Sequence, residues 1–363
     1  MFAVVSLAIY FGGYTYIGFR TVGGLGLKYP QGWHVFTGIM MLAVLGVAGM
    51  IFSRVSVPAV SQILGPLGFI STGIWGIFIT VFILNDLVNI SNLIFKLQNF
   101  RYWSTVIALS ISVIACIWAL LNAALILKVK EVTITVPDLP APSVKIALIS
   151  DLHITSFTSP QSVKGIFEKT AGLNPDIIVI AGDVSDTKLY ANGRYKDFGF
   201  DILKAPYGVY AVTGNHEYYG DLDDFLALFK NAGIPVLQDE SVRIDNVITV
   251  AGINDIYWNK AGKIKSVLAK TPSDYPVLFL SHRPEAFDAA ADSGRTVIQL
   301  SGHTHAGQIP PIEIARRYFM KYNYGLYKSG SSTMYVTSGA RWWGPPMRFG
   351  NFGEIAVITL KKQ

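Results

Sequence analysis

Two histidines, His303 and His305, stand two residues apart directly after the mostly apolar run 296–300. A run of this kind is typical of a buried strand, and Gly302 allows the backbone to turn where the strand ends. Two imidazoles so placed can each direct a ring nitrogen at a different metal ion. A lone histidine after an apolar run is more often a satisfied core residue, but five of the six histidines in this chain follow such runs.

Four other apolar runs end in residues of the same kind. They are 144–150, 177–180, 209–212 and 277–280, and each leads into an acidic, amide or imidazole side chain. Side chains at the carboxyl ends of strands gather at one edge of an open α/β sheet. We therefore expect one cluster of two carboxylates, four imidazoles and one amide oxygen, made of Asp151, His153, Asp183, Asn215, His282, His303 and His305.

Seven such ligands are too many for one ion and suit two. Nitrogen and oxygen ligands without thiolate favour Mn, Fe, Zn or Co, and Asp183 is the natural bridge because a carboxylate can bind one ion with each oxygen. Two ions about 3.5–4 Å apart can hold the attacking and leaving oxygens of a phosphoryl displacement and can acidify a bridging water. The pattern predicts two-metal hydrolysis of a phosphoester.

The first third of the chain differs in composition from the rest. Residues 1–128 hold six Lys or Arg but one acidic residue, Asp86, whereas the remainder is nearly balanced in charge, which argues against a nucleic-acid-binding surface. Four apolar stretches, 2–19, 33–53, 64–84 and 103–127, reach the length of about 20 residues that crosses a bilayer. We predict a four-helix transmembrane region over 1–128. The single cysteine, Cys116, lies within it, so no disulfide can form inside the chain.

From residue 129 onward the composition is that of a layered α/β domain. Residues 131–136 alternate like a strand, prolines come next, and short apolar runs then alternate with helical patterns at 161–173, 222–231 and 284–291. We therefore place a second domain over 129–363. Four spans would put both chain ends on one side of the membrane. The loop charges, four basic residues against three, favour that domain lying outside the cytoplasm.

Between residues 144 and 360 the sequence resembles the calcineurin-like metallophosphoesterases. The resemblance rests on Asp151-Leu152-His153, Gly182-Asp183, Gly214-Asn215-His216-Glu217, His282 and Gly302-His303-Thr304-His305, all in order. It implies two packed mixed β-sheets flanked by helices and a metal-dependent phosphoric ester hydrolase. By the same resemblance, one ion takes Asp151, His153, Asp183 and His305, and the other takes Asp183, Asn215, His282 and His303.

The resemblance also assigns roles to two residues that are not ligands. It implies that His216 contacts the phosphate and protonates the leaving oxygen, and that Asp186 orients this histidine. A helix N-cap is the alternative interpretation of Asp186. Purple acid phosphatases have a tyrosine at that position. Protein phosphatases have an arginine directly after it, where this chain has Thr187. The phosphate-binding arginine of that branch is therefore missing, and the candidate substitutes are Arg283, Arg341 and Arg348.

The best overall match is to the branch with membrane spans ahead of the phosphoesterase domain, where relatives resemble hydrolases of lipid-linked pyrophosphates such as UDP-diacylglucosamine. We therefore expect a multi-pass plasma-membrane enzyme of lipid metabolism, a phosphodiesterase or pyrophosphatase. Manganese is a typical ion for it, and neither nucleic acid nor an obligate protein partner is expected. The basic and aromatic segment 309–328 either contacts lipid headgroups or is an ordinary covering loop.

Two other functions stay open. The enzyme could hydrolyse soluble nucleotides or other small phosphoesters with the same chemistry. An inactive membrane sensor or scaffold is the third hypothesis. It predicts the loss of metal ligands, and none of the ligands is lost.

Overall fold

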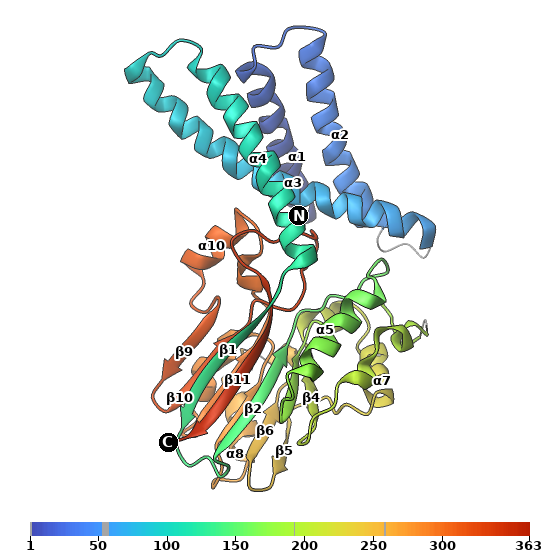
Figure 1. Cartoon of the computed structure of the whole chain (residues 1–363), viewed down its shortest axis with the longest axis vertical. Helices are drawn as coiled ribbons and strands as arrows, with labels where there is room; N and C mark the ends of the chain where they lie inside the picture. The colour runs from blue at the N-terminus through green and yellow to red at the C-terminus, as the bar shows by residue number, and fades with distance from the viewer. Residues whose placement is uncertain (1, 53–57, 192, 258) are drawn as a thin grey trace. The chain divides into compact units, whose positions relative to one another are not determined.

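The computed structural model describes residues 2–52, 58–191, 193–257 and 259–363, which are drawn in colour in Figure 1. They form two compact units. The first is helical and holds Met1–Ile126 together with two later segments, Gln308–Ala315 and Gly344–Gly350. The second holds Leu127–Gly307, Arg316–Trp343 and Asn351–Gln363. Composition alone gives no sign that two segments from the second half of the chain group with the helices.

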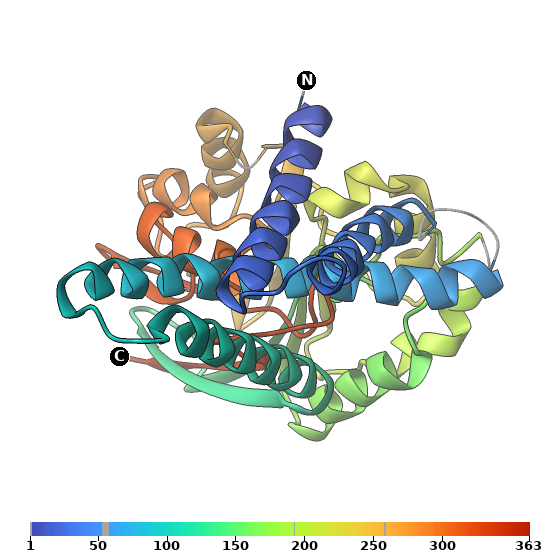
Figure 2. The same cartoon turned by 90° about the horizontal axis from the view of Figure 1, so that it is seen from above.

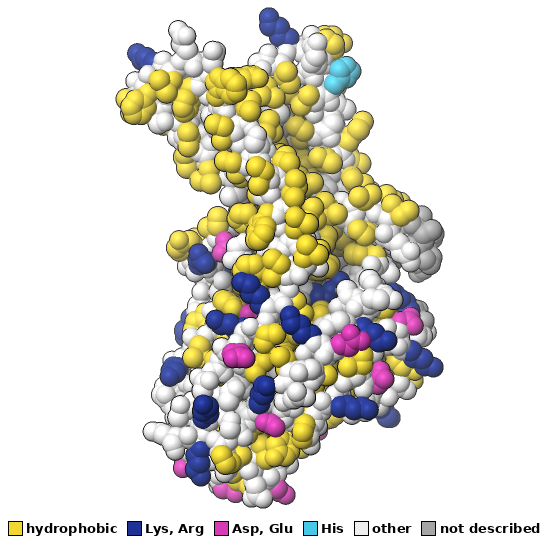
Figure 3. All heavy atoms as spheres, in the orientation of Figure 1, with side chains coloured by type: hydrophobic (Ala, Val, Ile, Leu, Met, Phe, Trp, Pro, Cys, Tyr) yellow, Lys and Arg dark blue, Asp and Glu magenta, His cyan; other side chains and the backbone are white. Residues whose placement is uncertain are grey.

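The helical unit is built from α1 (Phe2–Gly24), α2 (Gln31–Phe52), α3 (Pro58–Phe95) and α4 (Phe100–Leu125). Figure 2 shows α3 between α1 and α2 on one side and α4 on the other. Among the described residues, three helices are long and apolar enough to cross a membrane, within Gln31–Phe52, Ser61–Phe95 and Phe100–Leu125. The helix α1 covers the first predicted span and is not among these three. Figure 3 shows hydrophobic side chains over much of the visible surface of this unit.

The helix α3 is much longer than the predicted third span. It has 38 residues, contains Pro66 and continues to Phe95. The added length carries polar side chains that bond within the unit. Asp86 accepts a hydrogen bond from the Tyr16 hydroxyl at 2.6 Å and pairs with Arg20 at 2.7 Å. The pairing gives this carboxylate a structural role, since opposite charges compensate one another in an apolar surrounding.

The second unit contains two mixed sheets. The first has the order β1-β11-β2-β3-β4 and the second β5-β6-β7-β8-β10-β9. The strands of the first sheet are β1 (Leu127–Val136), β2 (Ser143–Ile149), β3 (Ile177–Ala181), β4 (Val209–Val212) and β11 (Gly353–Lys362). Those of the second are β5 (Glu240–Ile244), β6 (Ile248–Gly252), β7 (Val277–Leu280), β8 (Val297–Ser301), β9 (Gly325–Ser329) and β10 (Ser332–Val336). The neighbours β2, β3 and β4 run parallel, as do β6, β7, β8 and β10.

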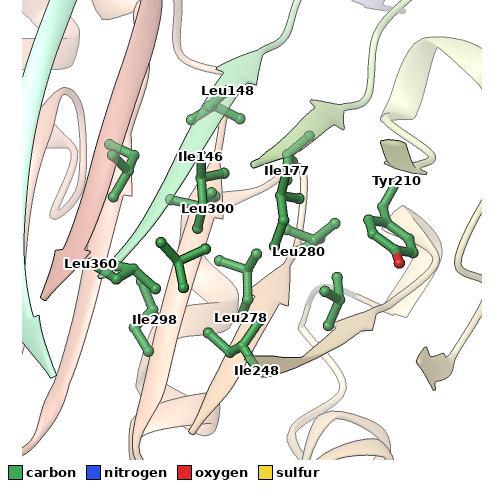
Figure 4. Packing of buried hydrophobic residues seen from close by; sticks show 14 of the residues in the cluster. Ile146, Leu148, Ile177, Tyr210, Ile248, Leu278, Leu280, Ile298, Leu300 and Leu360 are labelled. Atoms are coloured by element: carbon green, nitrogen blue, oxygen red, sulfur yellow. The ribbon is translucent and has the colours of Figure 1, made fainter. Parts of the chain in front are cut away.

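The two sheets pack face to face around a single apolar layer. Ile146 and Leu148 of the first sheet meet Leu278, Ile298 and Leu300 of the second, all of them buried (Figure 4). Their runs are almost wholly apolar because both faces of these strands are covered. The outer face of the first sheet packs on α5 (Pro160–Gly172) and α7 (Leu222–Asn231), and that of the second on α8 (Ala261–Ala269) and α9 (Phe287–Ala291). The expected fold of two packed sheets flanked by helices is confirmed.

Two predicted segments take a different form from the one expected. The pattern at 284–291 becomes a 3-10 turn, Pro284–Ala286, followed by the short helix α9. The segment 309–328 is not an ordinary loop, because it contains the amphipathic helix α10 (Ile312–Phe319) and the first residues of β9. No residue of α10 is buried, so its apolar face adds nothing to the core of the unit.

Candidate metal centre

Five strands deliver the predicted ligands to one edge of the paired sheets. β2, β3 and β4 lead into the loops of Asp151, Asp183 and the five-residue helix α6 (Asn215–Tyr219), while β7 and β8 lead into His282 and His303. Several of these loops hold left-handed backbone, with φ of 57° at Asp151, 52° at Asp183 and 73° at His303. Each such residue costs roughly 1–2 kcal/mol, and this kind of strain concentrates at functional sites.

The first group consists of Asp151, His153 and His305, whose ligand atoms lie within 4.8 Å of one another. Nε2 of His153 is 3.0 Å from Nε2 of His305, and Nε2 of His305 is 3.4 Å from Oδ1 of Asp151. Asp151 is fully buried, and its carboxylate accepts the backbone N–H of His303 at 3.1 Å. Two imidazole nitrogens and a carboxylate oxygen thus converge on one point.

The second group consists of Asp183, His282 and His303. Nε2 of His282 lies 3.1 Å from Oδ2 of Asp183, and Nδ1 of His282 donates to the carbonyl of Ala181 at 2.7 Å, which leaves Nε2 to face the carboxylate. Asn215 is also buried, and its Oδ1 has no hydrogen-bond partner among the described residues. A buried amide oxygen without a donor is costly, and a cation would satisfy it.

His216 and Asp186 lie together beside these groups. Nδ1 of His216 is 2.8 Å from Oδ1 of Asp186, and the same oxygen is 2.9 Å from Nδ1 of His153. Asp186 therefore orients both a predicted ligand and the predicted acid, and it is not at the N-terminus of any described helix. His216 also lies within ligand distance of His153 and Asp183. Its bond to Asp186 and its greater exposure favour a role outside the ligand set.

The electrostatics of the pocket favour positive charge. Burial raises the pKa of Asp151. Burial alone would lower the pKa of His153, but Asp186, Asp183 and Asp151 outweigh it and raise that pKa to about 9. Against the same effect of burial, Asp183 and Asp151 raise the pKa of His282 to about 10. The carboxylates thus stabilise cations in the positions that face them.

The donor set fits two divalent ions. It combines buried carboxylates, imidazoles and an orphaned amide oxygen, which is the mixed nitrogen and oxygen chemistry that Mn, Fe, Zn and Co accept. Asp151, His153 and His305 would hold one ion, and His282, His303 and Asn215 the other. Asp183 faces both groups, with Oδ2 at 3.7 Å from Nε2 of His153 and 3.1 Å from Nε2 of His282.

Two residues that support the site have no role predicted from the sequence. The buried carboxylate of Glu217 accepts the backbone N–H groups of Asp183 at 3.0 Å, Val184 at 2.8 Å and Gly214 at 2.6 Å. It thereby ties two ligand loops together. Asp255 comes after β6 and receives the Nε–H of Arg283 at 3.1 Å. Asp255 could have been predicted, because it is a polar residue that comes soon after an apolar run. The hydrogen bonds of Glu217 could not, because they are made to backbone N–H groups.

The three candidate phosphate-binding arginines have different surroundings in the structure. Arg283 reaches the second group, with Nη1 at 3.2 Å from Nε2 of His303. Arg341 is buried and donates to the carbonyl of Leu152 at 3.0 Å, so it supports the loop after β2. Arg348 is fully buried in the helical unit, where its backbone N–H donates to the carbonyl of Ala119 at 2.9 Å.

Two exposed aromatic rings flank His216. The centroid of the Tyr219 ring is 5.6 Å from that of His216, and the centroid of Trp343 is 5.7 Å away, both in edge contacts. Tyr219 is 73% exposed and Trp343 50% exposed. Large aromatic surfaces of this kind beside a buried polar pocket can receive a flat or apolar part of a ligand.

Comparison with known proteins gives an independent result. The family model described as calcineurin-like phosphoesterase matches residues 144–307. An uncharacterized metallophosphoesterase of Helicobacter pylori (strain J99) is 34% identical over 240 residues, covering 64% of this chain and 64% of the relative. An uncharacterized metallophosphoesterase of Aquifex aeolicus is 30% identical over 246 residues, covering 65% of this chain and 92% of the relative.

A third relative also carries membrane segments by its name. It is a transmembrane protein with metallophosphoesterase domain from Danio rerio, 32% identical over 275 residues, covering 71% of this chain and 63% of the relative. The chain therefore spans a little under two thirds of the length of the Helicobacter and Danio relatives.

Proposed function

Because the chain belongs to the calcineurin-like metallophosphoesterase family, we propose that it is a two-metal phosphoesterase acting on a lipid-linked phosphodiester or pyrophosphate. Family membership and the apolar helices support a metal-dependent phosphoester hydrolase associated with a membrane. The number of ions, the substrate and the catalytic roles are parts of the same proposal. A substrate of the UDP-diacylglucosamine kind has the required chemistry, a pyrophosphate on a lipid anchor.

The observation that carries the proposal is the position of Asp183. Its Oδ2 lies 3.7 Å from Nε2 of His153 and 3.1 Å from Nε2 of His282, one imidazole from each ligand group, which supports a shared carboxylate. When bound, the ions would supply Lewis acidity toward the phosphoryl oxygens and the means to ionise water near neutral pH. The protein's part is to hold the two groups at a fixed spacing, and the buried bonds of Glu217 support this.

His216 is placed to handle the proton of the leaving group. Its Nδ1–H donates to Oδ1 of Asp186 at 2.8 Å, which fixes the ring and leaves Nε2 as the atom that can hold the transferred proton. A leaving alkoxide needs that proton, and a positioned acid contributes about 10²–10⁴ in rate. Asp186 acts through His216 and is therefore a positioning residue.

The lipid-linked substrate is supported by the membrane helices in the same chain. Two segments, Gln308–Ala315 and Gly344–Gly350, group with those helices, and the first begins three residues after the ligand His305. We further propose manganese as an effective ion and the plasma membrane as the location, with the α/β unit outside the cytoplasm. The loop charges of the sequence support this side.

Soluble phosphodiesters are the second candidate. The exposed rings of Tyr219 and Trp343 beside His216 favour it, because a nucleobase can stack on either ring. The same rings would accept the base of a nucleotide-linked lipid. The choice between the candidates therefore depends on the lipid anchor.

A substrate panel decides between them. Detergent-purified full-length protein loaded with manganese is assayed against lipid pyrophosphates, soluble nucleotide diesters and bis-p-nitrophenyl phosphate. We expect the lipid pyrophosphates to have the highest kcat/KM. A higher kcat/KM for the soluble nucleotides would favour the second candidate, and activity that survives complete removal of metal would refute both.

A further inference from the structure

The helix α10 turns its apolar side outward. Ile312, Ile314, Tyr318 and Phe319 are all exposed, Tyr318 by 76% and Phe319 by 87%. Residues three, four and seven positions apart share one face of a helix, so these four side chains and Ala315 form a continuous surface, the outer apolar face. A surface helix in a water-soluble domain turns such a face toward the core instead.

The polar side of α10 faces the protein. Glu313 and Arg316 are only half-buried as whole residues, but Nη1 of Arg316 is fully buried. The carboxyl carbon of Glu313 lies 3.8 Å from the place that a Cβ on Gly350 would take, so its side chain points toward the segment 344–350. This is the orientation expected of a helix whose outer surroundings are apolar.

The residues directly before α10 pack on an apolar helix that is long enough to cross a membrane. Ile309 is buried with Ile77 of α3. The carbonyl of Pro310 lies against Gly76 of the same helix, where an added Cβ would be 2.6 Å from it. The backbone N–H of Glu313 donates to the carbonyl of Ile309 at 2.9 Å, so the first turn of α10 is bonded to a residue that is packed on α3.

An exposed apolar face next to membrane helices has the lipid bilayer as its natural partner. Aromatic side chains are favoured at the boundary between headgroups and acyl chains, and α10 ends in Tyr318 and Phe319. Arg317, which is also exposed, matches the negative charge of lipid phosphates. We propose that α10 lies in the bilayer interface, with its outer apolar face among the upper acyl chains and Arg317 at the lipid phosphates. This membrane contact does not depend on the proposed phosphoesterase activity.

Nitroxide labels on single cysteines test this placement in the full chain. The native Cys116 is replaced by alanine, and Tyr318→Cys or Phe319→Cys then carries the label. The protein is placed in vesicles of equal parts phosphatidylcholine and phosphatidylglycerol. Electron paramagnetic resonance measures collisions of the label with oxygen, which concentrates in lipid, and with a water-soluble nickel complex. Tyr207→Cys is the matched control, because Tyr207 is also an exposed tyrosine and comes just before β4.

We expect the ratio of oxygen to nickel collisions to be several-fold higher at positions 318 and 319 than at position 207. Nickel collisions as frequent at 318 and 319 as at 207 would place α10 in water and overturn the proposal. Rare collisions with both reagents would overturn it too, since protein would then cover the face. In that case a dependence on the density of protein in the vesicles would identify a second copy of the chain.

Hydrogen exchange provides a second measurement that needs no label. Ile314→Gln combined with Phe319→Gln makes the outer apolar face polar, and both positions are exposed, so the unfolding temperature should stay that of the wild type. In the same vesicles we expect the backbone amides of α10 to exchange several-fold faster in this variant, because the helix loses its lipid contact. Equal exchange in the variant and the wild type would overturn the proposal.

Discussion

Asp183 is the residue whose carboxylate faces an imidazole of each ligand group. Removing it takes away the oxygen, Oδ2, that lies near His153 and His282, and with it the negative charge beside them. We expect Asp183→Ala to lose both ions and all measurable hydrolysis together. Metal content after manganese loading and gel filtration, read by mass spectrometry, checks this. Asp223→Ala, at an exposed acidic position in the first turn of α7, should keep both ions.

The prediction for His216 concerns proton transfer to the leaving group and not metal binding. We expect His216→Ala to keep both ions and to lower kcat about 10²–10⁴-fold on an alkyl phosphodiester. The loss should shrink on p-nitrophenyl esters, whose leaving group departs without a proton. Rates on the two esters, measured with the same enzyme preparation, provide the test.

The outcome for His216 also settles its place in the ligand set. It lies within ligand distance of His153 and Asp183, so loss of one ion from His216→Ala would assign it to the metal. An equal rate loss on both kinds of ester would show that it is not the acid.

At the residue level, the sequence predicts the side chains at the ends of apolar strands and misses those that act through the backbone. Asp151, His282 and His303 can be named because each comes soon after such a run. The role of Glu217 cannot, because it depends on backbone N–H groups from a loop more than thirty residues away.

At the level of elements, the loops after the strands are held in conformations that only certain residues allow. Gly182 has φ of +83°, and a side chain there would lie 2.7 Å from Cα of Gly214 and 2.9 Å from Nδ1 of His282. We expect Gly182→Ala to lower the free energy of unfolding by at least about 2 kcal/mol, since left-handed strain and overlap add. It should also reduce metal binding, because Asp183 is the next residue.

Gly165 on α5 is the matched control for this substitution. It is exposed, and nothing lies within 4 Å of the position that its Cβ would take. Alanine is favoured over glycine inside a helix by about 0.5–1 kcal/mol, so Gly165→Ala should raise stability slightly. Chemical denaturation of both variants measures the difference in their free energies of unfolding. Equal stability of the two would show that the loop after β3 tolerates a side chain.

Some element boundaries can be predicted from the sequence and others cannot. β4, β7 and α7 begin and end where the sequence predicts, because their apolar patterns match a face that is buried. The end of α3 and the existence of α10 are not predicted. Beyond residue 84 α3 is stabilised by polar bonds such as Asp86 to Arg20, and α10 buries none of its residues. Neither segment buries a residue in a core.

At the scale of the whole molecule, two segments of the second half complete the helical unit. Ile309 and Met347 are buried with Ile77, Ala115 and Ala119. Asn122 donates its side-chain N–H to the carbonyl of Arg348 at 2.9 Å. A chain cut before residue 129 therefore loses the surface on which these segments pack. We expect such a fragment to unfold at a lower temperature and to expose apolar side chains.

The same truncation tests whether the helices are needed for activity on a substrate embedded in a bilayer. We expect fragment 129–363, carrying Ile309→Gln and Met347→Gln to keep it soluble, to retain metal and to hydrolyse bis-p-nitrophenyl phosphate. It should lose most of its activity on a lipid pyrophosphate embedded in vesicles, because enzyme and substrate no longer share one bilayer. A short-chain, water-soluble analogue of the same lipid is the control and should be hydrolysed at a rate close to that of the full chain. Equal activity on the embedded lipid would show that the helices are only a tether, and the soluble-substrate candidate would gain.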